Sequence, residues 1–142
     1  MDLTQCQMDA SALEAFLAVE FAEVAADFAV ERVTREGCVV RLKVAARHLR
    51  PGGTVSGPSM FALADVGVSL AILSRLGPVA LAVTTSCAMD FMRKPVAGRD
   101  LIGVVRLLKL GRVLAVGDVL IFSEGETSPV ARASMTYSIP PK

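Results

Sequence analysis

The stretch that decides the fold runs from Arg50 to Leu76 and reads RPGGTVSGPSMFALADVGVSLAILSRL. Its first part is rich in Gly and Pro, which indicates a loop, and an apolar run follows Pro58. Pro is favoured at the first helical position, because its missing N–H would have no partner there and its φ is already helical. The pattern therefore predicts one long apolar helix from about Pro58 to Leu76, ended by the Gly-Pro pair at 77 and 78.

One carboxylate, Asp65, interrupts this apolar run. A membrane span needs roughly 20 apolar residues, whereas Met60 to Leu73 offers fourteen and includes Asp65 and Gly67. We therefore expect this segment to be a helix buried in the core of a soluble domain. Burying a lone carboxylate is unfavourable unless it is hydrogen-bonded or protonated, and Ser69, one turn further on, is a candidate partner. The acid has either a structural role or the role of a general base or nucleophile beside a reacting carbonyl.

The start of the helix offers a second chemical group. Ser56 or Gly57 is expected to cap the helix, and the Gly57 N–H lies at its positive end, where a carbonyl oxygen that gains charge is stabilised. Pro58 has no N–H to donate. Asp65 follows Gly57 by eight residues, which is about 12 Å along a helix. If both groups act on one bond, they must come from two different subunits; the alternative is that Ser56, Gly57 and Pro58 only form a capped helix start.

The rest of the chain predicts an α+β fold in a single domain over residues 1–142, in which an antiparallel sheet wraps around the long helix. A short amphipathic helix is expected at about 10–25, and a hairpin at about 28–33 and 39–44. Four strand-like runs follow the long helix, at 79–92, 101–110, 112–122 and 130–139, and their short connections predict an antiparallel meander. Because a helix has only one face against a sheet, we expect self-association to cover the other.

Composition excludes several classes of function. Fifteen Lys and Arg balance fourteen Asp and Glu, without a basic block, so no nucleic-acid interface is expected. The N-terminus MDLTQCQMDASALEAF has no basic region before an apolar one, which argues against a secretory signal and for a cytoplasmic protein. Cys6, Cys38 and Cys87 match neither C-x-x-C nor a zinc spacing. We expect reduced, structural thiols and no metal, with a reactive thiol as the minor alternative.

The string HLRPGGTVSGPSMFALAD, from His48 to Asp65, resembles the signature of the hotdog-fold acyl-CoA thioesterases of the phenylacetic-acid-degradation type. In that family a loop ending in Gly-Thr-aliphatic-His-Gly-Gly leads into a helix that carries the catalytic Asp. The resemblance continues through AVTTSCAMDFMRKPVAGRDLIGVVRLLKLGRVLAVGDVLIF and covers roughly residues 37–138. It implies a sheet wrapped around the helix, two hotdogs paired across a continuous sheet as a dimer or tetramer, and sites at subunit interfaces.

The resemblance also implies roles for individual residues. Asp65 matches the catalytic acid and Gly57 the oxyanion donor. Thr84 matches a Ser or Thr that helps to hold the attacking water, a place that Thr85 or Ser86 takes if the register is shifted. Segments 91–96 and 109–114 match segments that contact CoA, and their Arg and Lys side chains would bind its phosphates unless they are only solvated surface. The expected substrate-binding residues are Arg50, Ser56, Thr85, Phe91, Met92, Arg93, Lys94, Pro95, Val96, Lys109, Leu110, Gly111 and Arg112.

Two residues depart from the family pattern. Ser56 stands where the family has His, and Arg50 where it commonly has Asn; His48, the only His, is expected to be structural. The resemblance implies hydrolysis of an acyl-CoA thioester without a cofactor. The Ser56 change keeps a non-catalytic acyl-CoA-binding protein as an alternative. A hydratase or dehydratase is a weaker one, since Phe61 and Ala62 occupy the part of the helix where such an enzyme carries Glu. The acyl group and the choice of dimer or tetramer stay open.

Overall fold

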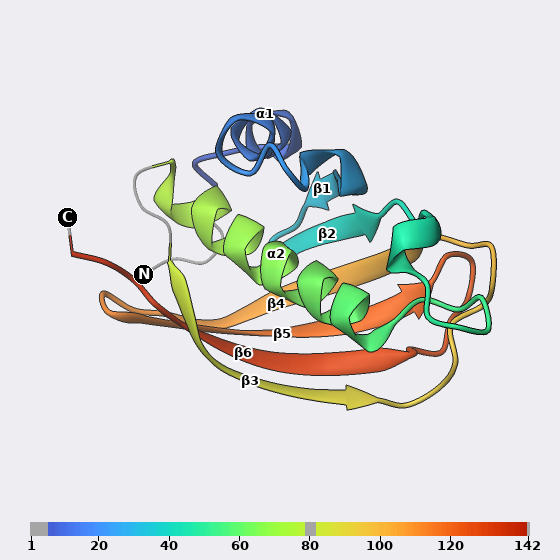
Figure 1. Cartoon of the computed structure of the whole chain (residues 1–142). Coiled ribbons are helices and arrows are strands. Elements are labelled where there is room, and N and C mark those ends of the chain that lie inside the picture. The colour runs from blue at the N-terminus through green and yellow to red at the C-terminus, as the bar shows by residue number, and fades with distance from the viewer. Residues whose placement is uncertain (1–5, 79–81, 142) are drawn as a thin grey trace.

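The computed structural model describes residues 6–78 and 82–141 and contains one long helix and one antiparallel sheet that curves around it (Figure 1). The predicted α+β hotdog architecture is confirmed. In chain order the elements are α1 (Ala10–Glu20), η1 (Ala25–Asp27), β1 (Phe28–Val33), β2 (Gly37–Leu42), η2 (Ala46–His48), α2 (Gly57–Leu76), β3 (Val83–Phe91), β4 (Leu101–Leu110), β5 (Leu114–Ser123) and β6 (Ala131–Ser138).

Most element bounds follow the sequence pattern, with one clear exception. The predicted N-terminal helix is too long, because α1 ends at Glu20 and a separate 3₁₀ turn, η1, precedes β1. The run predicted at 79–92 forms β3 from Val83 to Phe91, and residues 79–81 lie outside the described residues. The long helix starts at Gly57, one residue before the predicted Pro58, because Ser56 is the cap.

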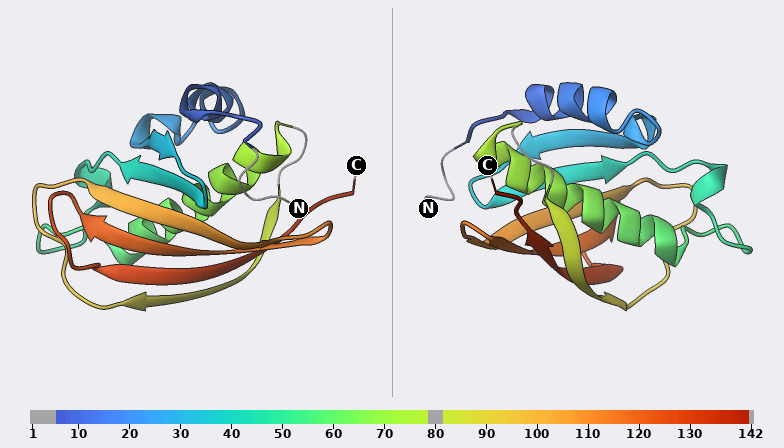
Figure 2. Two further views of the ribbon diagram at one scale, coloured as in Figure 1. Left: turned by 180° about the vertical axis from the view of Figure 1, so that it is seen from behind. Right: turned by 60° about the vertical axis from the view of Figure 1, so that its left-hand side comes forward.

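The strand order is β1-β2-β4-β5-β6-β3. The predicted meander is correct for β4, β5 and β6 but wrong for β3, which pairs with β6 and not with β4, the next strand in the sequence. β4 has no free edge for β3, since β2 pairs along one side and β5 along the other. β3 therefore forms an outer edge of the sheet (Figure 2).

The core lies between α2 and the concave face of the sheet. Leu63 and Val68 on α2 are fully buried, and Val105 on β4 is 2% exposed. The helix sits close to β4, since a Cβ at Gly67 would come within 2.9 Å of Val105 Cγ2. Among the described helices, α2 is the only one long and apolar enough to cross a membrane, but most of its apolar window is buried in this core. The expectation of a core helix is confirmed.

Candidate active site

Asp65 lies in the middle of α2, and its carboxylate is held by two hydroxyl groups from the sheet. Thr84 Oγ1 on β3 donates a hydrogen bond to Asp65 Oδ1 at 2.6 Å. The Tyr137 hydroxyl on β6 lies 2.7 Å from the same oxygen and 2.7 Å from the backbone oxygen of Asp65. Within the part of the chain that the structure describes, these hydroxyls, and not the expected Ser69, bind the carboxylate. They offset the desolvation of a half-buried charge.

Strand register explains why these two hydroxyls meet. Thr84 and Tyr137 are directly opposite each other in the β3–β6 ladder, so both side chains point to the same face of the sheet, toward α2. The ladder shifts between Thr84 and Ser86, which leaves Thr85 as an extra residue in the strand. Thr85 is exposed, and its hydroxyl bonds to the backbone of the neighbouring strand. Of the three adjacent hydroxyl residues, Thr84 is the one that contacts Asp65.

Tyr137 is the functional candidate that sequence reasoning missed. Its side chain is fully buried. Burial, and then the hydrogen bond to Asp65, raise the pKa of the Tyr137 phenol, so the group is a protonated donor at neutral pH. A signal was present: Tyr137 is the only Tyr of the chain, at a core-facing position of a strand, and a buried tyrosine hydroxyl needs a hydrogen-bond partner.

The thiols near this region are poor nucleophiles. Burial, and then the charge of Asp65, raise the pKa of the exposed Cys87 thiol. Burial raises the pKa of Cys38 to about 12. Both are therefore protonated at neutral pH, which argues against a reactive thiol at these two positions. Cys38 is buried, as expected of a structural cysteine, whereas Cys6 and Cys87 are exposed.

The start of α2 leaves one backbone donor unused. Ser56 is the N-cap: its Oγ accepts the Ser59 N–H at 3.3 Å, and its carbonyl accepts the Met60 N–H at 3.1 Å. Pro58 has no N–H. Among the described residues, the first turn therefore has a single unpaired N–H, that of Gly57. The Phe91 ring lies beside it, because a Cβ at Gly57 would be 3.4 Å from Phe91 Cζ.

The loop before the helix is fixed by His48. His48 is 7% exposed, and its Nδ1 accepts the Ala45 N–H at 2.8 Å. Its carbonyl accepts the Ser56 N–H at 2.8 Å, and its Nε2 lies 3.2 Å from Asp27 Oδ2. These contacts connect the cap of α2 to η1, the turn before β1 that carries Asp27. The geometry therefore agrees with the structural role expected for His48. Arg50, by contrast, lies exposed at the start of the loop.

The two predicted CoA-binding segments lie at opposite ends of the sheet within one subunit. Phe91 leads into residues 92–96 at the end of the sheet where α2 begins, whereas Lys109 to Arg112 form the β4–β5 turn at the other end (Figure 1). The Thr84 side chain lies toward the second end. Thr84 and Phe91 are seven residues apart, or about 23 Å along an extended strand. A single chain does not bring the two segments together.

The members of these segments differ in exposure. Arg93 and Lys94 are exposed and line a small polar hollow of about 250 Å³. Pro95 is buried, and the Val96 N–H bonds to Ser123 Oγ at 2.9 Å, so both anchor the segment. In the other segment Leu110 is buried and Gly111 is half-buried, whereas Phe91, Met92, Lys109 and Arg112 are exposed.

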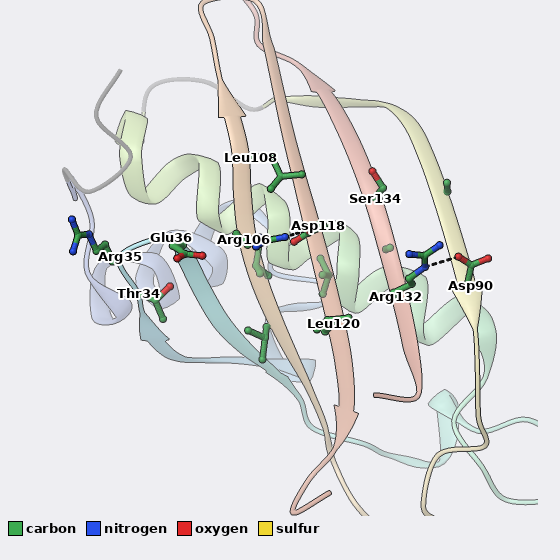
Figure 3. Close-up of a pocket in the computed structure, with 15 residues that line it drawn as sticks. Thr34, Arg35, Glu36, Asp90, Arg106, Leu108, Asp118, Leu120, Arg132 and Ser134 are labelled. Carbon is green, nitrogen blue, oxygen red and sulfur yellow. Dashed lines mark hydrogen bonds and ion pairs between the residues drawn. The ribbon is translucent and has the colours of Figure 1, made fainter. Parts of the chain in front are cut away.

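A larger concavity of about 730 Å³ lies on the convex face of the sheet, away from α2 (Figure 3). It contains the ion pairs Arg106–Asp118, at 2.9 Å, and Arg132–Asp90, at 2.8 Å. Asp65 lines neither this concavity nor the smaller hollow. The charged groups of these two ion pairs are largely exposed and bonded to each other, so they offer no acid or base in a dry environment.

The protein is therefore an α+β hotdog domain with a candidate acid site. The acid is the half-buried Asp65 carboxylate on the central helix, which two hydroxyls hold beside the free edge of β3. A family model described as "Thioesterase superfamily" matches residues 52–130. The chain belongs to the thioesterase superfamily. No match is found among curated proteins.

Solved structures agree with this membership. A "putative thioesterase" from Silicibacter sp. TM1040 is 56% identical, with a TM-score of 0.92, and the match covers 97% of this chain and 96% of that one. A variant of the phenylacetic acid degradation protein PaaI from Thermus thermophilus is 32% identical, with a TM-score of 0.70 and coverage of 82% and 97%. PaaI from E. coli shares the fold at 23% identity, with a TM-score of 0.76 and coverage of 89% of each chain.

Proposed function

We propose that this protein is an acyl-CoA thioesterase in which Asp65 activates water, or attacks the thioester directly. The observation that carries the proposal is the Asp65 carboxylate, held at Oδ1 by Thr84 and Tyr137 beside the open edge of the sheet. In the water route, the water oxygen bonds to the thioester carbonyl carbon while its proton passes to Asp65. The C–S bond then breaks, and the proton goes to the departing CoA sulfur.

The oxyanion donor in this proposal is the Gly57 N–H of a second subunit. α2 and β3 run in opposite directions along each other, with Asp65 beside Thr84 and Gly57 beside Phe91. Suppose that two copies pair β3 with β3, antiparallel, about a two-fold axis. The Phe91 end of one copy then faces the Thr84 end of the other. This places Gly57 of one subunit toward Asp65 of its partner, as their separation along α2 requires.

The free edge of β3 supports this dimer. Almost all of β3 is exposed, including Val83, Cys87 and Phe91, and an edge strand presents unpaired N–H and C=O groups that pair readily with another strand. The same symmetry brings Arg93 and Lys94 of one subunit to the end of the site that carries Lys109 and Arg112 of the other. The two groups of cations would then bind the phosphates of one CoA.

The change from the family His to Ser56 is compatible with catalysis in this scheme. The Ser56 hydroxyl is engaged in the first turn, where it accepts the Ser59 N–H and lies 3.0 Å from Ser59 Oγ. It holds the turn whose free N–H polarises the carbonyl. Asp65 and the Gly57 N–H supply the base and the oxyanion donor.

The test is Asp65→Asn against a panel of short, long and aromatic acyl-CoAs, with CoA release followed by chromatography. The substitution keeps the side-chain size and removes the base, so we expect release to fall by a factor of about 10²–10⁴. Asp118→Asn is the matched control, since Asp118 lies on the convex face and pairs with Arg106. An Asp65→Asn protein that releases CoA as fast as the wild type would defeat the proposal.

Non-catalytic acyl-CoA binding is the second candidate, motivated by Ser56 in place of the family His. A binding protein would show thermal stabilisation by acyl-CoA in proportion to occupancy, without release of CoA by the wild type. A thioesterase releases CoA under the same conditions.

A further inference from the structure

We propose that Tyr137 is a positioning residue that selects which oxygen of Asp65 takes part in the chemistry. It occupies Oδ1 together with Thr84 and so leaves Oδ2 for the water or the thioester. This inference rests on the proposed function, because it assigns Tyr137 a role in the reaction of Asp65.

The hydrogen bonds on the carboxylate are asymmetric. Oδ1 is bound by both hydroxyls, at 2.6 Å from Thr84 and 2.7 Å from Tyr137. Over residues 6–78 and 82–141, no hydrogen bond reaches Oδ2. A carboxylate pinned at one oxygen has a defined orientation, and the free oxygen keeps its lone pairs for a proton.

Tyr137 is itself held rigidly. Its ring is fully buried, and its backbone lies in register with Ala115 on β5 and Thr84 on β3. The hydroxyl is therefore fixed by the sheet, whereas Asp65 belongs to the helix. The contact joins the two layers of the fold at the reacting group.

The Tyr137 hydroxyl has one proton, and two oxygens of Asp65, Oδ1 and the backbone oxygen, each lie 2.7 Å from it. A hydrogen bond to a charged oxygen is the stronger one, so the proton points to Oδ1 while Asp65 is ionised. When Asp65 has taken a proton from water, the hydroxyl can turn to the backbone oxygen without movement of the ring. Tyr137 thus stabilises Asp65 in its ionised form, at the start of the reaction. Once Asp65 is protonated, the Tyr137 hydroxyl still has an acceptor, the Asp65 backbone oxygen, and is not left unpaired.

The first test is Tyr137→Phe, which keeps the ring and removes the hydroxyl. We expect kcat to fall about ten-fold with little change in KM, because the oriented base is lost but the substrate contacts remain. Met135→Leu is the control: Met135 is buried on the same strand, and this volume-conserving change should move neither quantity.

A second measurement separates this inference from the proposed hydrolysis and does not depend on the folding of Tyr137→Phe. Tyr137 is the only Tyr of the chain, so fluorotyrosine labels a single position. The fluorine NMR signal of the labelled wild type should shift in Asp65→Asn, because the hydroxyl loses its carboxylate partner, and should stay unchanged in the control Asp118→Asn. If it does so while no acyl-CoA is hydrolysed, Tyr137 still positions Asp65 and the assigned reaction is wrong.

Two results would overturn the role of Tyr137. One is a fluorine signal that is insensitive to Asp65. The other is a folded Tyr137→Phe enzyme with the kcat of the wild type.

Discussion

Deletion of a single backbone N–H, at Gly57, tests the oxyanion donor directly. Gly57→Pro removes this N–H, and Gly57→Ala keeps it. Both substitutions add a Cβ before Pro58, so the steric penalty of a side chain before proline is shared by the pair. The added Cβ lies 3.4 Å from the Phe91 ring, an ordinary contact with an exposed side chain. The two variants therefore differ chiefly in the donor.

The backbone at this position accepts proline. Pro is favoured at the first helical position, and Ser56, which would precede it, already has the extended conformation that a residue before Pro requires, with φ −75° and ψ 157°. The fold should therefore survive, and circular dichroism and thermal melts check this.

The magnitude follows from the count of donors in the first turn. The Ser59 and Met60 N–H groups are engaged by Ser56, and Pro58 has none, so no neighbour can replace the lost donor. Loss of one oxyanion donor typically lowers kcat by about 10²–10³, or roughly 3–4 kcal/mol of transition-state stabilisation. We expect this loss for Gly57→Pro, and a change within about three-fold for Gly57→Ala.

The assay follows the loss of thioester absorbance rather than a thiol reagent, because Cys6 and Cys87 are exposed and would react with such a reagent. Each variant is compared at saturating substrate, so that kcat is measured separately from KM. If Gly57→Pro and Gly57→Ala turn over at similar rates, the Gly57 N–H does not stabilise the oxyanion.

Three further outcomes are expected. If the β3 strands of two copies pair about their middle, a short bis-maleimide should link the two Cys87 side chains in a Cys6→Ser variant, which has no other exposed cysteine among the described residues. A monomer on a denaturing gel would contradict that dimer. Gly37→Ala should destabilise the fold by several kcal/mol in urea unfolding, since its Cβ would lie 2.2 Å from the Val105 carbonyl oxygen; an unchanged midpoint would refute this packing. Arg47, by its hydrogen bond, lowers the pKa of Asp27 below its usual value near 4, so Asp27 adds stability that is present above that value and lost as pH falls through the folded-state pKa. Asp27→Asn should flatten this part of the acid-unfolding curve.

Local sequence determined the elements of this protein. The predicted bounds of β1 and β4 agree with the structure, and α2 differs from the prediction by one residue. Alternation of apolar residues states which face of a strand is buried, and a Gly-Pro loop before an apolar run states where a helix begins. These signals lie within a few residues of each other, so an α+β fold and the position of Asp65 in its central helix were predictable, while the hotdog class followed from the family resemblance of the stretch from His48 to Asp65.

Tertiary structure decided which elements are neighbours. The sequence placed β3 beside β4, but the edges of β4 were taken by β2 and β5, and β3 joined β6 instead. That pairing sets Thr84 opposite Tyr137 and both against Asp65, which is 72 residues away from Tyr137 in the chain. Strand alternation fixes the face that a side chain occupies but not the strand beside it, because pairing partners depend on which edges remain free once the whole sheet has formed. The sequence alone therefore determined that an acid would lie in the core helix, and only the assembled sheet decided which hydroxyls hold it.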